Sequence, residues 1–189
     1  LYNLGKIMKF LNGNDLASFI KARQETEVRS LVQNSKVKPK LAIIITIDNP
    51  VINLYVKLKQ SYGQDIGIDV DVHRIHQSEA STLIDQLNKD ESVHGIILQL
   101  PIEDPSKTDE LVNLVSPDKD VDALGEKANF DPATPTAILW LLAGYNIDFL
   151  GKKVLLIGEG KLVGKPLYKM PKSSNVDVEI ANDETKNMN

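Results

Sequence analysis

The chain has 189 residues, of which 42% are hydrophobic and 25% are charged, and its formal net charge is −4. This composition is ordinary for a globular protein, and the length is enough for one large or two small domains with a sizeable core. The mild negative charge argues against general binding to nucleic acid or to anionic membranes, so no partner of either kind is expected. Because cysteine is absent, disulfides, thiolate metal sites and a cysteine nucleophile are excluded.

No apolar run in the sequence approaches the roughly 20 residues that span a bilayer. We treat residues 1–7 as a leader and Met8 as the first plausible start. A cytoplasmic enzyme is the default expectation, with the matrix of an organelle as the alternative.

Helix and strand signals alternate along the first two thirds of the chain. Asn14 is a good helix N-cap, Gly63 is expected to close the second helix, and Ser78 starts the third with an imperfect capping box. The β-branched run Lys40–Ile47 is typical of a strand buried on both faces. In chain order we expect helix 14–32, strand 40–47, helix 51–63, strand 68–75, helix 78–90, strand 93–100 and helix 106–115.

The rhythm lapses into a proline-containing loop between Ser116 and Pro135 and then restarts. We expect helix 134–146, strand 152–158, a short helix from about Val163 that Pro171 ends early, and strand 176–180. The β-α-β order predicts a two-domain α/β fold, with an N-terminal parallel-sheet substrate domain followed by part of a Rossmann-type dinucleotide-binding domain. We place the catalytic domain, which would bind the substrate, at residues 8–135, and the linking helix and cofactor domain at residues 136–189.

Polar side chains are expected beyond the carboxyl ends of the first-domain strands, where open parallel sheets bind ligands. Tyr55 and Lys59 are four residues apart on one helix and share a face. Gln99 ends the third strand, and Asp122 follows the next helix. Two interpretations remain open: these side chains converge on one crevice, or they are an exposed helix face, a strand end and a turn cap.

Five motifs in a fixed order extend across nearly the whole chain from Phe10. They are "YVKLK" (55–59), "GIILQLP" (95–101), "SPDKDVD" (116–122), "PATP" (132–135) and "GKKVLLIG…LVGKP" (151–166). Together they resemble the bifunctional methylenetetrahydrofolate dehydrogenase/cyclohydrolase family. That resemblance implies oxidation of 5,10-methylene-tetrahydrofolate to the methenyl form with a nicotinamide cofactor, and then hydrolysis to 10-formyl-tetrahydrofolate.

The resemblance also implies roles for the matching residues. Tyr55 would stack on the folate rings, Lys59 would be the catalytic amine, Gln99 would hold that amine, Asp122 would bind the donor-rich edge of the pterin, and Pro101 would complete the substrate site. A homodimer is implied as well. A catalytically silent folate-binding paralogue, a cyclohydrolase alone and a dehydrogenase similar to shikimate dehydrogenase are the alternatives.

The chain departs from the family pattern near the site. The family's serine before the tyrosine is replaced, two positions after the "KDVD" motif and two in the "PATP" segment differ, and the stretch 122–132 is shorter. The replacing residues are Ile52, Ala123, Leu124, Ala133 and Ala137. These changes concern substrate affinity and loop geometry more than the catalytic side chains.

The cofactor turn combines a glycine pattern with an unexpected charge. The resemblance places the cofactor on Gly158, Glu159, Gly160, Val163 and Gly164, where backbone amides suit a pyrophosphate. Glu159 stands where the family has an arginine, and two like charges about 4–6 Å apart repel by roughly 3–4 kcal/mol at an effective dielectric of about 20.

The next strand ends near a second acidic residue, Asp183, which is suited to a ribose 2′-hydroxyl or is simply a turn residue. We therefore expect NAD to be favoured over NADP, with weak hydride transfer as the alternative. Lys161 and Lys165 could offset the negative charge or remain solvated.

Two further patterns are given structural interpretations. His73 and His76 lie on a predicted strand, where both cannot easily face one ion, so no metal site is expected. Trp140 has helical spacing with Leu139 and Leu142, which predicts core packing.

Overall fold

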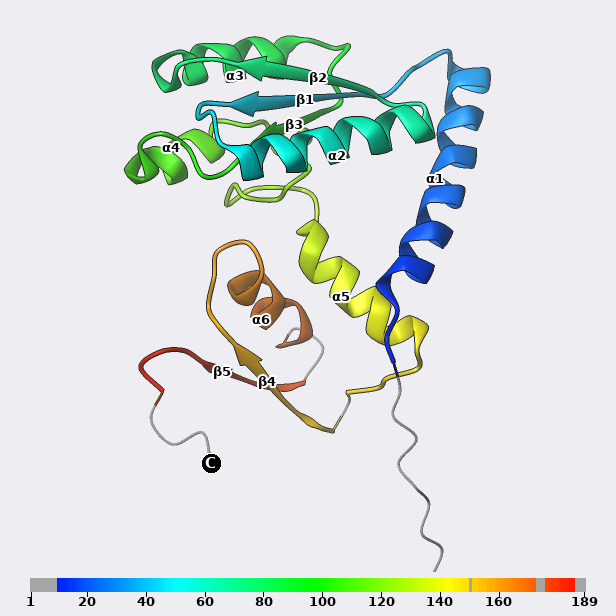
Figure 1. The fold of residues 1–189 in the computed structure, drawn as a ribbon, viewed down its shortest axis with the longest axis vertical. Coiled ribbons are helices and arrows are strands. Elements are labelled where there is room, and N and C mark those ends of the chain that lie inside the picture. Colours follow the sequence, from blue (N-terminus) through cyan, green and yellow to red (C-terminus); the bar gives the residue numbers. More distant parts are fainter. Residues whose placement is uncertain (1–9, 150, 173–175, 186–189) are drawn as a thin grey trace, which may run out of the picture.

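The computed structural model describes residues 10–149, 151–172 and 176–185, without the side chains of residues 171–172. The expected leader and Met8 lie outside these residues. Two α/β bodies are joined by a linking helix, and the N-terminal helix contacts both the first body and this linking helix (Figure 1). The elements are α1 (Gly13–Ser35), β1 (Lys40–Ile45), α2 (Pro50–Ile66), β2 (Asp69–Arg74), α3 (Ala80–Lys89), β3 (Gly95–Leu98), α4 (Thr108–Val112), α5 (Ala133–Gly144), β4 (Lys153–Ile157), α6 (Gly164–Lys172) and β5 (Asp177–Ala181).

The first body is built on a three-stranded parallel sheet of order β2-β1-β3. Residues 42–45 of β1 are all buried, which confirms the prediction of a strand covered on both faces. Ile43 belongs to a core cluster with Ile52 and Val56 of α2, whereas Ile44 belongs to a cluster with Ile84 of α3. The parallel strands therefore end together at one edge of the sheet, where the candidate site lies.

Helix boundaries differ from the sequence prediction at the start of α1 and at the end of α2. The N-cap of α1 is Asn12, whose side chain accepts a hydrogen bond from the backbone N–H of Asn14 at 3.0 Å, so Asn14 is already helical. Gly63 does not end α2, which runs on to a C-cap at Gly67 with φ of 86°. Gly63 is needed for packing instead, because an added Cβ would lie 2.5 Å from Cγ2 of Val70 in β2.

The predicted capping box at Ser78 is also wrong. Residues Gln77–Glu79 form a short 3-10 helix, and α3 begins only at Ala80. The capping box lies two residues earlier, at His76 and Glu79, where the backbone N–H of His76 donates to Oε2 of Glu79 at 3.1 Å. The backbone amide of His76 is thus satisfied by a glutamate within the 3-10 turn.

The second body contains the parallel pair β4 and β5, in which Ile157 pairs with Ala181. Leu167 of α6 and Val178 of β5 are buried in this body, while Leu155 and Ile157 are exposed. The helix α6 includes Pro171 and ends one residue later at Lys172. Strand, glycine turn, helix and strand therefore follow in the order that the sequence predicts.

The linking helix α5 contacts α1 and α6. Trp140 was expected in the core, but 44% of its surface is exposed, and the guanidinium of Arg23 on α1 lies 6.0 Å from the centre of its ring. Apolar residues occupy all sides of α5, so periodicity does not reveal which side faces solvent. Among the described helices, none combines the length and apolarity required to cross a membrane.

Candidate functional site

The central contact of the site joins α2 to the end of β3. Nζ of Lys59 donates a hydrogen bond to Oε1 of Gln99 at 2.8 Å, and both side chains are half-buried. Asn49 caps the start of α2 by accepting from the backbone N–H of Val51 at 2.8 Å, which orients the helix as it leaves β1. Two residues that are 40 apart in sequence are thereby brought into direct contact.

The orientation of the Gln99 amide is fixed by its neighbours. Its backbone N–H donates to the carbonyl of Ile44 at 2.9 Å, and its Nε2 donates to the carbonyl of Leu100 at 3.1 Å. A flipped amide would place two oxygens against each other, so Oε1 is the atom that faces Lys59. Pro101 follows in a cis peptide bond and is exposed at the surface.

Tyr55 lies one turn before Lys59 and presents an open aromatic face. Its exposed fraction is 57%, and Val51, Leu54 and Leu58 on the same helix are similarly exposed. An apolar surface therefore borders the Lys59 amine. Such a surface is suited to a flat aromatic ligand rather than to a hydrated ion.

Asp122 supplies the acidic group of the site and is half-buried. Burial raises the pKa of this carboxyl, the charge of Lys59 lowers it, and the charge of Asp120 raises it further. The balance keeps the pKa above the ordinary aspartate value. Lys59 thus interacts with both Gln99 and Asp122, and the predicted side chains form one group instead of three separate surface features.

Two neighbouring residues of the "SPDKDVD" motif were missed by the sequence reasoning. Asp120 is only 4% exposed, and Nζ of Lys119 donates to three backbone carbonyls at the end of α3. The one available signal was the density of charge in "DKDVD", because charged residues are rarely buried without partners.

The glycine turn after β4 is shaped by close backbone approach. Gly158 has φ of 98°, and its N–H donates to the carbonyl of Ala181 at 2.7 Å. An added Cβ on Gly164 would lie 2.2 Å from the carbonyl oxygen of Gly158, so no side chain fits there. Gly160 has open space around it, and Val163 accepts a bond from the N–H of Leu167 at 2.9 Å. The turn is therefore a cradle that a pyrophosphate group fits, above the start of a nine-residue helix.

Acidic side chains flank this cradle. Glu159 follows β4 and Asp183 follows β5, and because the two strands are parallel neighbours, both residues lie at the same edge of the sheet. Both are exposed. Lys161 extends from the turn to Asp109 of α4 and forms an ion pair with it.

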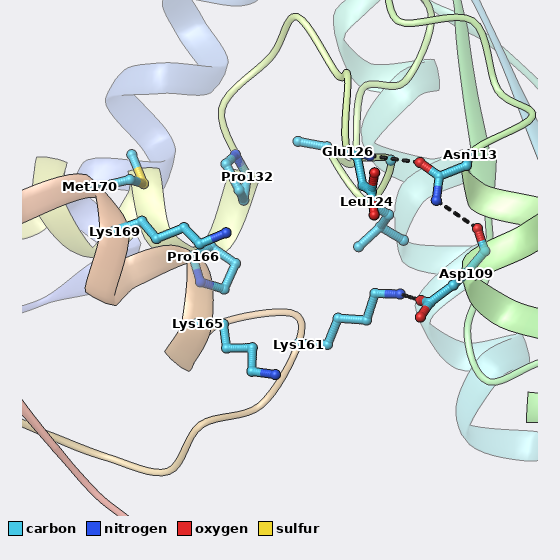
Figure 2. Close-up of a pocket in the computed structure, with 12 residues that line it drawn as sticks. Asp109, Asn113, Leu124, Glu126, Pro132, Lys161, Lys165, Pro166, Lys169 and Met170 are labelled. Atoms are coloured by element: carbon cyan, nitrogen blue, oxygen red, sulfur yellow. Dashed lines mark hydrogen bonds and ion pairs between the residues drawn. The ribbon is translucent and has the colours of Figure 1, made fainter. Parts of the chain in front are cut away.

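A cavity of about 460 Å³ lies between α4, the loop at residues 123–126 and α6 (Figure 2). Figure 2 shows Lys161 pointing across it toward Asp109, while Lys165 and Lys169 project from the α6 side. Tyr55, Lys59, Gln99 and Asp122 do not line this cavity, although Ala123 next to Asp122 does. Within the described ranges, no three His, Cys, Asp or Glu residues are grouped as metal ligands.

Comparison with known proteins extends along almost the whole chain. The tetrahydrofolate dehydrogenase/cyclohydrolase catalytic domain matches residues 11–122, and the NAD(P)-binding domain of the same family matches residues 132–189. The bifunctional protein FolD of Acholeplasma laidlawii is 36% identical over 191 residues, which cover 94% of this chain and 68% of that protein. FolD of Geotalea daltonii is 30% identical over 193 aligned residues, and the alignment covers 95% of this chain and 69% of that protein.

A solved structure gives the same result. The bifunctional enzyme FolD, methylenetetrahydrofolate dehydrogenase/cyclohydrolase, from Campylobacter jejuni superposes with a TM-score of 0.90 at 31% identity, covering 95% of this chain and 68% of that one. Sequence, structure and domain order agree. The chain therefore belongs to the tetrahydrofolate dehydrogenase/cyclohydrolase family.

Proposed function

We propose that this protein oxidises 5,10-methylene-tetrahydrofolate to 5,10-methenyl-tetrahydrofolate with a nicotinamide cofactor and hydrolyses the product to 10-formyl-tetrahydrofolate. The observation that carries the proposal is the 2.8 Å bond from Lys59 to Gln99, made beside the half-buried Asp122. Membership of the family supplies the two reactions, and this contact supplies the proton-transfer group that the hydrolysis requires.

Substrate binding depends on Asp122, Tyr55 and Pro101, which surround the Lys59–Gln99 contact in this proposal. The ionised carboxylate of Asp122 accepts hydrogen bonds from the N–H donors at the pterin edge, and such charge-assisted bonds are about twice as strong as neutral ones. The exposed ring of Tyr55 would provide the stacking face, and the exposed Pro101 would complete the same site. Because the pKa of Asp122 is raised, folate binding is lost as the pH falls through that raised value.

Hydrolysis requires a group that first accepts and then returns a proton. Water adds to the methenyl carbon to form a C–O bond, and the neutral amine of Lys59 takes the proton that the water loses. The bond from that carbon to N5 then breaks, N5 receives the proton from Lys59, and the hydroxyl proton leaves as the formyl C=O forms. The net change is consumption of one water and release of one proton.

Gln99 suits this cycle because it is neutral. Its oxygen holds the Lys59 amine at 2.8 Å, yet it does not stabilise the ammonium as strongly as a carboxylate would. Gln99 therefore positions the Lys59 amine without forming an ion pair with it.

The glycine turn would hold the pyrophosphate of the cofactor at Gly158, Gly160, Val163 and Gly164. A bound cofactor would supply the hydride acceptor that the oxidation requires. Glu159 opposes a 2′-phosphate by about 1–4 kcal/mol, the lower figure applying where water screens the exposed side chain.

Asp183, beyond the neighbouring strand, is placed to accept a bond from a ribose 2′-hydroxyl. Lys161 is already paired with Asp109, which reduces its ability to offset Glu159. We infer that NAD is preferred to NADP.

The same departure at Glu159 favours one alternative, a cyclohydrolase that has lost efficient hydride transfer. Domains at residues 8–135 and 136–189, assembly as a homodimer and a cytoplasmic location remain predictions. The matched ranges 11–122 and 132–189, with α5 as the link, support that domain division.

One assay tests the proposal. Purified protein is mixed with 5,10-methylene-tetrahydrofolate and either NAD or NADP, and methenyl formation is followed; hydrolysis of added 5,10-methenyl-tetrahydrofolate is measured separately. We expect hydrolysis without any cofactor, and oxidation faster with NAD. Hydrolysis alone would support the cyclohydrolase alternative, faster oxidation with NADP would contradict the cofactor inference, and folate binding with neither reaction would identify a silent paralogue.

A further inference from the structure

The loop that carries Asp122 is anchored like an additional strand of the first sheet. Asp120 forms an isolated parallel bridge with Ile96 of β3, and the N–H of Ile96 donates to the carbonyl of Lys119 at 2.7 Å. Asp122 is thus only two positions along the chain from the residue that bridges to the sheet. Its position depends on how firmly these two anchors are held.

The buried carboxylate of Asp120 holds the far side of the loop. Its Oδ2 accepts the N–H of Gly125 at 2.7 Å, and its Oδ1 accepts the N–H of Leu124 at 3.4 Å. Gly125 fits closely, since an added Cβ would lie 3.0 Å from Asp120 Oδ2. Ala123, between the two ends, has φ of 53°, so the chain folds back over the carboxylate with Asp122 on the bend.

Lys119 anchors the near side of the loop to α3. Its ammonium donates to the carbonyls of Leu87, Asn88 and Asp90 at 3.0, 2.9 and 2.8 Å. All three donors of the amine are therefore used, at the negative end of the helix dipole. A lysine so completely bonded to backbone is a fixed anchor, not a mobile surface charge.

We propose that Lys119 and Asp120 are positioning residues for folate binding, which hold Asp122 in place. The inference rests on the folate-binding role proposed for Asp122. Burial is the main reason that the pKa of Asp122 is raised, and two charged groups modify it: Lys59 from α2 and Asp120 from its own loop. Asp120 opposes the ionisation of Asp122, and Lys59 favours it.

Replacing Asp120 by asparagine separates this role from simple support of the fold. Asp120→Asn has nearly the same shape but lacks the charge, so Asp122 should ionise more easily and the acid limb of kcat/KM should move to lower pH. The loss of a hydrogen bond to a charged group is expected to raise KM for 5,10-methenyl-tetrahydrofolate roughly tenfold or more, with a smaller effect on kcat. A residue that merely supports the fold would leave the acid limb where it is.

Asp118→Asn is the matched control, because it removes the same charge from the same loop. Asp118 is exposed, and its carboxylate accepts from Asn129 Nδ2 at 2.5 Å, away from the residues that act on Asp122. Lys119→Met is expected to raise KM for 5,10-methenyl-tetrahydrofolate, whereas Lys119→Arg should give a KM close to that of the wild type. Thermal unfolding of each variant identifies any that do not fold.

The outcomes distinguish this inference from the proposed function. A raised KM in Asp120→Asn, accompanied by a lower acid limb, and an unchanged KM in Asp118→Asn support the inference; an unchanged KM in Asp120→Asn overturns it. If the wild-type protein does not hydrolyse 5,10-methenyl-tetrahydrofolate, the proposed function fails, and a carboxyl carbon NMR titration of Asp122 in wild type and Asp120→Asn decides the electrostatic part. If Asp120→Asn does not fold, the inference stands or falls on whether Lys119→Met raises KM and Lys119→Arg reverses it.

Discussion

Replacing Gln99 by glutamate changes one charge at the centre of the proposed mechanism. The Lys59 amine would then face a carboxylate at the 2.8 Å now occupied by the amide oxygen. Two unit charges at that separation attract by about 6 kcal/mol at an effective dielectric of 20, and by about 1.5 kcal/mol in bulk water. Because both side chains are half-buried, we expect about 1.5–6 kcal/mol of extra stabilisation for the ammonium form.

This stabilisation should slow hydrolysis, because only the neutral amine accepts the proton from water. Each 1.4 kcal/mol corresponds to about a tenfold change, so Gln99→Glu should hydrolyse 5,10-methenyl-tetrahydrofolate at least about tenfold more slowly at neutral pH. Raising the pH should recover part of the rate. Gln99→Met is the control, since it removes the oxygen without adding charge and should show no such recovery. A Gln99→Glu enzyme with the wild-type rate at neutral pH would refute the role assigned to the amide.

Three further predictions concern the cofactor, the acidic group and the fold. Glu159→Arg should raise the ratio of kcat/KM with NADP to that with NAD by about five- to a thousandfold, as 1–4 kcal/mol implies, and an unchanged ratio would remove Glu159 from cofactor selection. Asp122→Asn should weaken folate binding yet raise the melting temperature at neutral pH. Burial raises the pKa of this carboxyl, so its ionised form destabilises the folded state at pH values above that raised pKa. The increase in melting temperature should therefore vanish in strong acid, where Asp122 is protonated in both states. Gly63→Ala should destabilise the protein by about 1–3 kcal/mol in urea unfolding, because its Cβ would lie 2.5 Å from Val70 Cγ2, whereas Gly13→Ala, with open space around it, should be nearly neutral.

Much of the fold could be predicted because it depends on local patterns. The β-branched run of β1 indicated a strand buried on both faces, and the alternation of strands and helices gave the parallel topology. Boundaries were less accurate where a contact from a distant segment decided them. Gly63 is a glycine because β2 passes close to it, and nothing in the sequence of α2 itself shows that strand.

The site was predictable in part. The positions of Lys59 and Gln99 in the sequence left open whether they meet, the resemblance to the family implied that they do, and the structure brings them into contact. Lys119 and Asp120 were missed, because their partners are backbone groups whose positions depend on the folded loop. The pairing of Lys161 with Asp109 joins residues 52 apart in two different bodies, and charge alone did not identify it among the available acidic residues.

The most direct test of the central claim is the rate of 5,10-methenyl-tetrahydrofolate hydrolysis in Lys59→Met, compared with Lys57→Met. Lys57 is an exposed lysine on the same helix, so the control removes an equal charge outside the Lys59–Gln99 contact. We predict that Lys59→Met abolishes hydrolysis while folate binding is largely retained, and that Lys57→Met keeps the wild-type rate. Unchanged hydrolysis in Lys59→Met would contradict the assignment of this amine as the proton-transfer group.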